Sequence, residues 1–230
     1  MRKGQLYIIA TPIGNLEDIS FRALKILSQA DIILAEDTRT TKKLLNKYEI
    51  KTRLESFNQH SSVNQQKRII SNLQSGQIIA LVSEAGTPGV SDPGSKLVEE
   101  IRKADSDILI TPIPGACALT TLISIAGIGT DKFTFLGFLP HKKGRNKALG
   151  VVKESLISVA LYESKHRFLK LLQELHDINL GNRSIVVGRE LTKLYETIYT
   201  DSVDNLLQYF QDNPQEVKGE FTIIIKKGRL

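Results

Sequence analysis

This chain of 230 residues is poor in the residues that cross-link a fold or bind metals. Cys117 is its only cysteine, which excludes an intrachain disulfide, and its small apolar neighbours predict a buried thiol rather than a reactive one. The four histidines show no metal-ligand spacing, so we expect no metal site. No apolar run approaches the ~18 residues that a membrane span needs.

The chain also begins without the signals of export. Met1, Arg2, Lys3 and Gly4 lead directly into a short apolar run, which lacks the longer core and the cleavage site of a signal peptide. We therefore expect a soluble cytoplasmic protein. The net charge of +6 (31 basic and 25 acidic residues) permits a polyanionic partner without requiring one. The tightest basic cluster, at 141–147, is compatible with either a solvated loop or phosphate contacts.

Two common nucleotide-binding motifs are missing. The dinucleotide fingerprint needs Gly-x-Gly-x-x-Gly after the first strand, where this chain reads Thr11-Pro12-Ile13-Gly14-Asn15. A phosphate loop needs Gly-x4-Gly-Lys followed by Ser or Thr, but residues 89–96 end in Gly94-Ser95-Lys96. The pattern therefore argues against a nucleoside triphosphate as the ligand.

The first half alternates short apolar runs with amphipathic segments. The runs at 6–10, 32–35, 78–82 and 108–111 are nearly continuously apolar, as strands buried on both faces are. Helices are predicted at 19–29 behind an Asp18 cap and at 62–74, where Ser62 and Gln65 resemble a capping box and Gly76 marks the end. Alternating strands and helices predict a mainly parallel sheet with helices on its faces.

The second half follows the segment Pro112-Ile113-Pro114-Gly115, which we take as a domain boundary that divides the chain into 1–114 and 115–230. Helix 165–176 has Phe168, Leu171, Leu172 and Leu175 on one face. Because the strands follow one another more closely here, the sheet is predicted to be mixed. The whole chain is thus predicted to form two α/β domains. The predicted strands lie at 133–138, 157–162, 184–187, 194–199 and 221–225.

Three loops rich in glycine or proline follow strands of the first half, at 11–15, 83–94 and 111–115. Glycine lets a ligand approach the backbone closely, and proline fixes φ. Because the carboxyl ends of parallel strands share one edge of a sheet, the three loops can converge on a single ligand crevice. This convergence is a stronger argument for a binding site than any one loop.

Charged residues also follow strand ends. Glu36, Asp37 and Arg39 come after strand 32–35, although acids at a helix N-terminus also suit the helix macrodipole. Glu163 and Arg167 follow strand 157–162, and the pair Arg189-Glu190 follows strand 184–187. Each of these two sets is either part of a site or a surface ion pair.

Together these motifs resemble one known family. The motifs lie at 6–16, 35–39, 85–94, 112–115, 137–140, 162–164 and 188–193. They resemble the ribosomal RNA small-subunit methyltransferase I family of bacteria, a branch of the tetrapyrrole methylase superfamily, over about residues 5–226.

The resemblance implies an enzyme with two α/β domains of the class III methyltransferase type, with S-adenosyl-L-methionine (SAM) held in the cleft between them. It implies methyl transfer to the ribose 2′-hydroxyl of a cytidine in the decoding region of small-subunit (16S) rRNA. It further implies a homodimer that works on an assembled 30S particle. The mild basic excess and the predicted crevice agree with this assignment.

Candidate site residues follow from the family motifs and from the positions of polar residues just after strand ends. In order of preference, Asp37, Glu84 and Glu36 are candidates for a general base, and Arg39 for a fork that holds substrate phosphate. The candidates for cofactor contact are Pro12, Gly86, Thr87, Pro88, Gly89, Val90, Ser91, Asp92, Gly115, Ala116, Cys117, Ala118 and Tyr162. The candidates for RNA contact are Lys142, Lys143, Arg145, Lys147, Arg167 and Arg189.

Three positions depart from the family pattern. Glu84 stands where Asp is usual, Ala116-Cys117 replaces Pro-Ser, and Lys165 replaces a proline. These departures bear on cofactor affinity, because a longer carboxylate and a weaker thiol donor change the available hydrogen bonds. Two rival functions remain: a C-methyltransferase of the same superfamily that acts on a tetrapyrrole, and an inactive relative that binds RNA.

Overall fold

The computed structural model describes residues 3–58, 61–91, 94–128 and 132–228. The chain divides into two compact units, Met1–Cys117 (unit 1) and Ala118–Leu230 (unit 2), whereas the sequence pattern places the boundary after residue 114. The predicted Asp92 contact falls outside the described residues. No helix in the described part of the chain is both long enough and apolar enough to cross a membrane.

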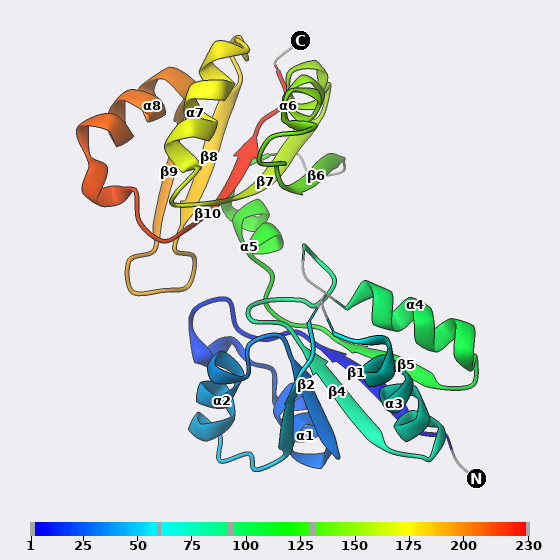
Figure 1. The fold of residues 1–230 in the computed structure, drawn as a ribbon. Helices are drawn as coiled ribbons and strands as arrows, with labels where there is room; N and C mark the ends of the chain where they lie inside the picture. The colour runs from blue at the N-terminus through cyan, green and yellow to red at the C-terminus, as the bar shows by residue number, and fades with distance from the viewer. Residues whose placement is uncertain (1–2, 59–60, 92–93, 129–131, 229–230) are drawn as a thin grey trace. The chain divides into compact units, whose positions relative to one another are not determined.

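Unit 1 contains a five-stranded sheet in the order β3-β2-β4-β1-β5, and all neighbouring strands are parallel (Figure 1). The predicted parallel sheet is therefore confirmed. The strands are β1 (Gln5–Ile9), β2 (Ile32–Ala35), β3 (Arg53–Ser56), β4 (Ile78–Val82) and β5 (Leu109–Ile113). The helices are α1 (Phe21–Gln29), α2 (Thr38–Lys47), α3 (Val63–Gln74) and α4 (Ser95–Ala104), with a 3₁₀ turn η1 (Leu16–Asp18).

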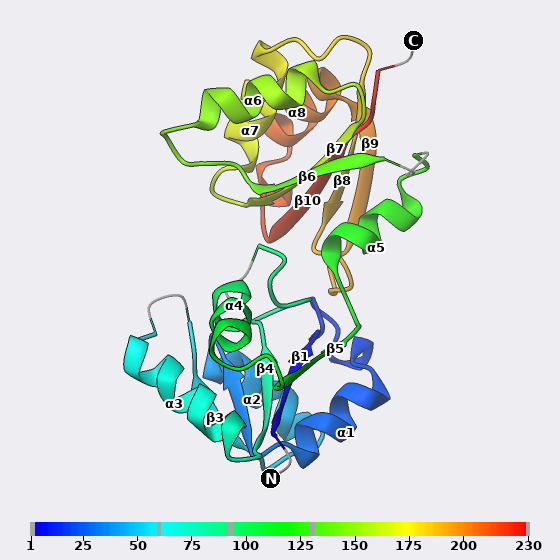
Figure 2. The same ribbon diagram turned by 90° about the vertical axis from the view of Figure 1, so that its right-hand side faces the viewer.

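Helices cover both faces of this sheet (Figure 2). Leu27 of α1 and Leu45 of α2 pack on one face with Ile9 and Ile33, while α3 and α4 pack on the other face. Burial of both faces explains the continuously apolar strands. The sequence pattern missed β3, because this edge strand is short, polar and only partly buried.

Unit 2 contains a second five-stranded sheet in the order β6-β7-β10-β8-β9, in which only β6 and β7 pair in parallel among the described strands. The predicted mixed sheet is confirmed. The strands are β6 (Phe133–Phe138), β7 (Ser158–Ser164), β8 (Ser184–Arg189), β9 (Thr197–Ser202) and β10 (Glu220–Ile225). The helices are α5 (Ala118–Ile125), α6 (Arg145–Glu154), α7 (Phe168–Asp177) and α8 (Val203–Asp212), with a 3₁₀ turn η2 (Pro214–Glu216).

The core of unit 2 lies between one face of its sheet and helices α6, α7 and α8. The ring of Phe168 stacks on Phe221 with centroids 3.8 Å apart and meets Phe210 edge to face at 4.8 Å. Helix α5 covers the opposite face, where a Cβ on Gly188 would lie 2.9 Å from Leu122 Cδ1. Glycine at 188 therefore lets this helix approach β8.

The structure confirms Ser62 as a helix cap and corrects two other details of the predicted caps. The Oγ of Ser62 accepts the N–H of Gln65 at 3.2 Å, but the Gln65 side chain donates to the Ser56 carbonyl instead of closing a capping box. The predicted Asp18 cap of α1 is wrong. Ser20 caps this helix by accepting the Ala23 N–H at 3.1 Å, and Asp18 ends the preceding 3₁₀ turn.

The strand predicted at 194–199 begins three residues later, at Thr197. Thr192 has φ of 65°, and its N–H donates to the Glu196 carboxylate at 2.5 Å, so the loop before β9 turns back on itself. Leu194 stays 88% exposed and Tyr195 66% exposed in this loop. Their apolar character thus suggested a strand that the loop geometry does not allow.

Candidate cofactor and substrate site

Three loops meet at the carboxyl ends of the strands of unit 1. Thr11, after β1, exchanges both backbone hydrogen bonds with Gly86, after β4, at 2.9 and 3.0 Å. The hydroxyl of Thr87 donates to the carbonyl of Ala116, in the loop after β5, at 3.2 Å. The predicted convergence of these loops is therefore present within unit 1.

The topology explains why this edge suits a ligand. Strands β1 and β4 are neighbours, but β1 leads to α1 on one face of the sheet and β4 leads, through the 83–94 loop, to α4 on the other. Adjacent strands whose connections leave toward opposite faces mark the switch point at which open α/β sheets bind ligands.

Glycine is required where the loops touch. A Cβ on Gly115 would lie 3.0 Å from the Ala10 Cβ, and one on Gly86, which has φ of +79°, would lie 3.3 Å from the Ile13 Cγ2. Gly89 has φ of +86° and no neighbour within 4 Å of an added Cβ, so its backbone borders open space. The edge thus offers main-chain polar groups and small side chains to a ligand.

The other predicted cofactor contacts belong to the same loops. Pro12 and Pro88 are buried in the loop packing, and Val90 closes a turn by donating its N–H to the Thr87 carbonyl at 3.2 Å. Ser91 has φ of 65°, which adds to the shaped character of this turn. The small residues after β5 that remain half-buried are Ala116, Cys117 and Ala118.

Tyr162 lies in unit 2, in strand β7. Its hydroxyl accepts the N–H of Leu119 at 3.1 Å, which satisfies one of the unpaired donors at the start of α5. Its ring packs edge to face on Phe135 with centroids 5.0 Å apart. The hydroxyl of Tyr162 therefore already has a structural role at the helix that begins with Ala118.

Asp37 has a clear structural role as the N-cap of α2. Its carboxylate accepts the Arg39 N–H at 2.8 Å and pairs with the Arg39 guanidinium through two hydrogen bonds of 3.1 and 2.8 Å. These hydrogen bonds lower the pKa of Asp37 to about 2. A carboxylate held so firmly in its charged form is a poor proton acceptor at neutral pH, which argues against the first choice of base.

Glu36 lies in a different environment. It is half-buried directly after β2, and burial, with the negative charge of Glu84 second, raises the pKa of Glu36 above its usual value. The pKa of Glu36 is therefore moved toward neutrality, whereas the pKa of Asp37 is moved away from it. The sequence placed all three predicted carboxylates at the same edge and ranked Asp37 first and Glu36 last; the pKa directions favour Glu36 over Asp37 instead, and they depend on side-chain contacts that the sequence does not show.

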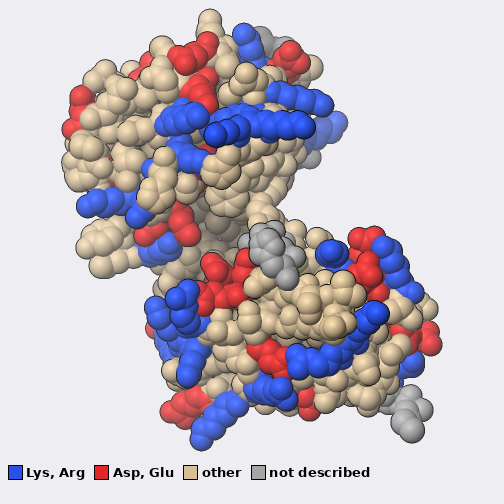
Figure 3. All heavy atoms as spheres, viewed as in Figure 1, with Lys and Arg blue, Asp and Glu red and all other residues tan. Residues whose placement is uncertain are grey.

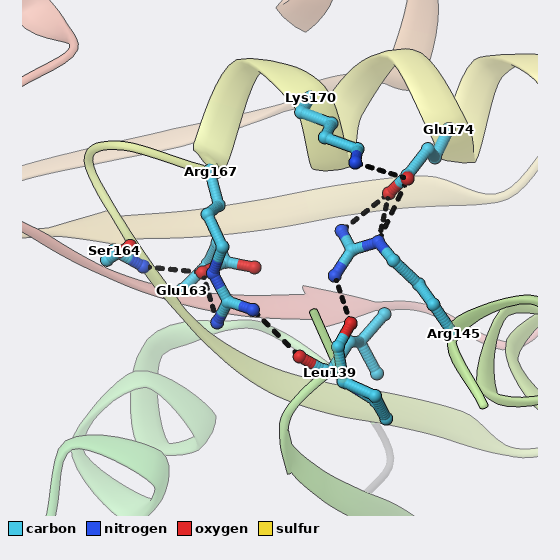
Figure 4. Close-up of polar contacts among 8 residues, drawn as sticks. Leu139, Arg145, Glu163, Ser164, Arg167, Lys170 and Glu174 are labelled. Atoms are coloured by element: carbon cyan, nitrogen blue, oxygen red, sulfur yellow. Dashed lines mark hydrogen bonds and ion pairs between the residues drawn. The ribbon is translucent and has the colours of Figure 1, made fainter. Parts of the chain in front are cut away.

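Three arginines predicted to contact RNA have their guanidinium groups engaged inside unit 2, and Figure 4 shows two of them, Arg145 and Arg167. Arg145 is buried, pairs with Glu174 at 2.5–2.9 Å and donates to the Pro140 carbonyl at 3.0 Å. Arg167 pairs with Glu163 and donates to the Leu139 carbonyl, both at 2.8 Å. These side chains hold the backbone and are not free to contact phosphate.

Arg189 behaves in the same way. It is buried, pairs with Glu216 at 2.6 Å and donates to the Lys218 carbonyl at 3.0 Å, so its partner is not the neighbouring Glu190. By contrast, Lys142, Lys143 and Lys147 are exposed. Only these lysines, of the predicted RNA contacts, remain available at the surface. No group of three or more potential metal ligands occurs among the described residues.

The profile of the family Tetrapyrrole (Corrin/Porphyrin) Methylases matches residues 5–207. The chain resembles the ribosomal RNA small subunit methyltransferase I of Halalkalibacterium halodurans, with 45% identity over 97% of this chain and 76% of that protein. It resembles the protein of the same name from Thermotoga maritima with 41% identity over 96% of this chain and 98% of that one.

Solved structures share the fold at low identity. A diphthine synthase structure has a TM-score of 0.74 and 14% identity, and the match covers 99% of this chain and 91% of that one. A Thermus thermophilus uroporphyrin-III C-methyl transferase complexed with S-adenyl homocysteine has a TM-score of 0.65 and 14% identity, covering 97% and 98%. By sequence and fold, the chain belongs to the tetrapyrrole methylase family and, within it, to the ribosomal RNA small subunit methyltransferase I group.

Proposed function

We propose that this chain is a SAM-dependent methyltransferase that methylates the ribose 2′-hydroxyl of a cytidine in the decoding region of small-subunit rRNA. The observation that carries the proposal is the match to rRNA small subunit methyltransferase I relatives over 96–97% of the chain. The three converging loops of unit 1 support it, because they provide a ligand-binding edge that lacks both common nucleotide motifs.

The residues at this edge fit an adenosyl cofactor. A ligand at this edge would meet the open backbone at Gly89, the small side chains of Ala116 and Cys117, and the buried Pro12. Together they present main-chain donors and acceptors to the ligand. When bound, SAM supplies a methyl group activated by the sulfonium sulfur. The protein's contribution is to exclude water and to align the acceptor hydroxyl for in-line attack.

We assign the proton transfer to Glu36. In the reaction the ribose O2′ forms a bond to the methyl carbon, the carbon–sulfur bond breaks, and the hydroxyl proton leaves. A ribose hydroxyl is a weak nucleophile, so a carboxylate within reach accelerates its attack by accepting this proton. The raised pKa of Glu36 makes it a better acceptor than Asp37, whose pKa is about 2.

Lys142, Lys143 and Lys147 are assigned to RNA phosphate. They lie exposed between β6 and the first turn of α6, and Figure 3 shows Lys and Arg side chains in a row on this side of unit 2. The net charge of +6 favours such a polyanionic partner. The proposal includes a homodimer that acts in the cytoplasm on the assembled 30S particle.

The deciding experiment measures methyl transfer from labelled SAM to small ribosomal subunits that lack the modification. We expect label in a single nucleotide, at the ribose, as read by nuclease digestion and mass spectrometry. Label in a base or in a ribosomal protein would contradict the proposal. Calorimetry with SAM separates an inactive relative from an enzyme, since an inactive relative binds no SAM at millimolar concentration.

A further inference from the structure

A second basic region lies on unit 1, along α2 and the turn that follows it. Residues 38–51 contain five basic residues and one acidic residue, and α2 itself contains no acid. Helix α4 differs: its Lys103 pairs with Glu99 at 2.6 Å. Figure 3 shows the Lys and Arg side chains gathered over α2.

Three of these five basic residues, Arg39, Lys42 and Lys51, help to line a groove of about 570 Å³. A volume of this size is typical of ligand sites. The floor is apolar, because Leu45 is buried and Ile50 and Leu54 are half-buried. The polar walls are Thr38, Arg39, Lys42, Asn46, Lys51 and Thr52. The α2 members recur at one-, three- and four-residue intervals, so they form one face of the helix.

Two of the three cations that line this groove have no ion-pair partner among the described residues. Neither Lys42 nor Lys51 forms an ion pair with any residue that the structure describes. Arg39 pairs with Asp37, but its side chain is still 88% exposed. Exposed cations above an apolar floor match a sugar–phosphate chain, whose phosphates need cations and whose riboses and bases need apolar contact.

The groove begins at the proposed reaction site. Thr38 and Arg39 open α2 after the N-cap Asp37, and Glu36 lies between this cap and the carboxyl end of β2. From Thr38 to Asn46 the helix face extends about 12 Å at 1.5 Å per residue. A strand bound there would run away from the edge that holds the candidate base.

We propose that this groove binds the sugar–phosphate backbone of single-stranded RNA next to the nucleotide that is methylated. The inference rests on the proposed function, because it identifies the chain as an RNA enzyme and names Glu36 as the base. It adds to the lysines at 142–147 a second RNA contact, supplied by Lys42 and Lys51.

The test compares Lys42→Gln/Lys51→Gln with the matched control Lys25→Gln/Lys67→Gln, which removes two exposed unpaired lysines from α1 and α3. The probe is a fluorescein-labelled single-stranded 12-nucleotide RNA with the decoding-region sequence, and its affinity is measured by anisotropy over a salt series. We expect the groove variant to lose about tenfold in affinity at low salt, and its slope of log affinity against log salt to fall by about 1.4, or 0.7 per contact. The control should match the wild type.

Two further measurements keep the outcomes distinct. Thermal unfolding checks that both variants fold, and Lys42→Arg/Lys51→Arg should restore binding because it keeps the charge. Methylation of unmodified small subunits should show a higher KM with unchanged kcat for the groove variant. Equal losses in the groove variant and the control, or no loss in either, would overturn the inference. Failure of the wild type to methylate ribose would instead overturn the proposed function.

Discussion

Three charged residues of unit 1 and three arginines of unit 2 are arranged in opposite ways. In unit 2, Arg145, Arg167 and Arg189 each pair with a glutamate and donate to a backbone carbonyl inside the fold. In unit 1, Lys42 and Lys51 have no ion-pair partner among the described residues, and Glu36 lies near the like charge of Glu84. These three arginines of unit 2 have their charges satisfied within the fold, whereas these three residues of unit 1 have no counter-ion of their own in the described part of the chain.

This difference separates structural charges from functional ones. A paired arginine that holds the Leu139 or Pro140 carbonyl fixes the start of the lysine-rich segment 141–147, so it acts on RNA only through the backbone it positions. Uncompensated charges at a sheet edge lower stability and are retained where binding or catalysis uses them. The contrast can be tested residue by residue.

The largest expected effect is on stability, from Arg145→Met. Removal of Arg145 takes the hydrogen-bond donor from the Glu174 carboxylate and from the Pro140 carbonyl, and leaves Glu174 only its longer ion pair with Lys170 at 3.8 Å. The expected cost is about 3 kcal/mol of unfolding free energy, the lower end of the range for breaking a buried pair. Chemical denaturation gives this value. Lys147→Met, an exposed position on the same helix, should change it by less than about 0.5 kcal/mol. Similar losses for both would erase the distinction between structural and surface cations.

The next effect is on catalysis, from Glu36→Gln. Loss of a general base typically lowers turnover by about 100-fold or more, and SAM affinity should not change, because the amide keeps the shape of the side chain. Single-turnover methyl transfer and calorimetry measure the two quantities. Unchanged turnover would remove Glu36 from the mechanism.

The pH dependence of the methyl-transfer rate tests the assignment of Glu36 in a second way. Only the charged form of Glu36 accepts a proton, so the rate should fall as the pH falls through its raised pKa. Glu84→Gln removes the like charge that contributes to this shift, so the acid limb of the rate profile should move to lower pH. A limb that stays in place would show that Glu84 does not act on the base.

A smaller effect is expected on RNA affinity, from Lys142→Gln/Lys143→Gln/Lys147→Gln. Loss of three phosphate contacts should lower the salt slope by about 2 and the affinity by about tenfold at low salt. The control Lys132→Gln/Lys153→Gln/Lys218→Gln removes three other exposed lysines of unit 2. If both triple variants bind alike, the segment has no specific role.

The parts of the fold that the sequence predicted well were those with short, clearly bounded apolar runs. Strands at 32–35, 78–82 and 133–138 have the predicted bounds, because mainly apolar runs of four to six residues are too short for a typical helix and fit a buried strand. The edge strand β3 and the start of β9 were missed, because their positions depend on exposure and on loop hydrogen bonds that no local pattern encodes.

The candidate site also has features that the sequence could predict and features that it could not. The loops at 11–15 and 83–94 could be brought together from the rule that parallel strand ends share an edge. Whether a given charge is paired or free could not be predicted from the sequence. Arg145 and Lys147 look equivalent there and differ only in the residues that lie beside them in the fold. Partners such as Glu174 are 29 residues away along the chain.

The smallest effect concerns Asp37, the counterpart in unit 1 of the paired carboxylates of unit 2. Its hydrogen bonds with Arg39 place its folded pKa at about 2, below the ordinary value of 3.8. A lowered carboxyl pKa stabilises the fold above about pH 4, and this contribution is lost as the pH falls from about 4 to 2. Asp37→Asn keeps an N-cap, so it should flatten the acid side of a Tm–pH curve in this range and leave methyl transfer near wild type. A marked loss of turnover in this variant, with SAM still bound, would return Asp37 to the role of base and reverse the ranking that places Glu36 first.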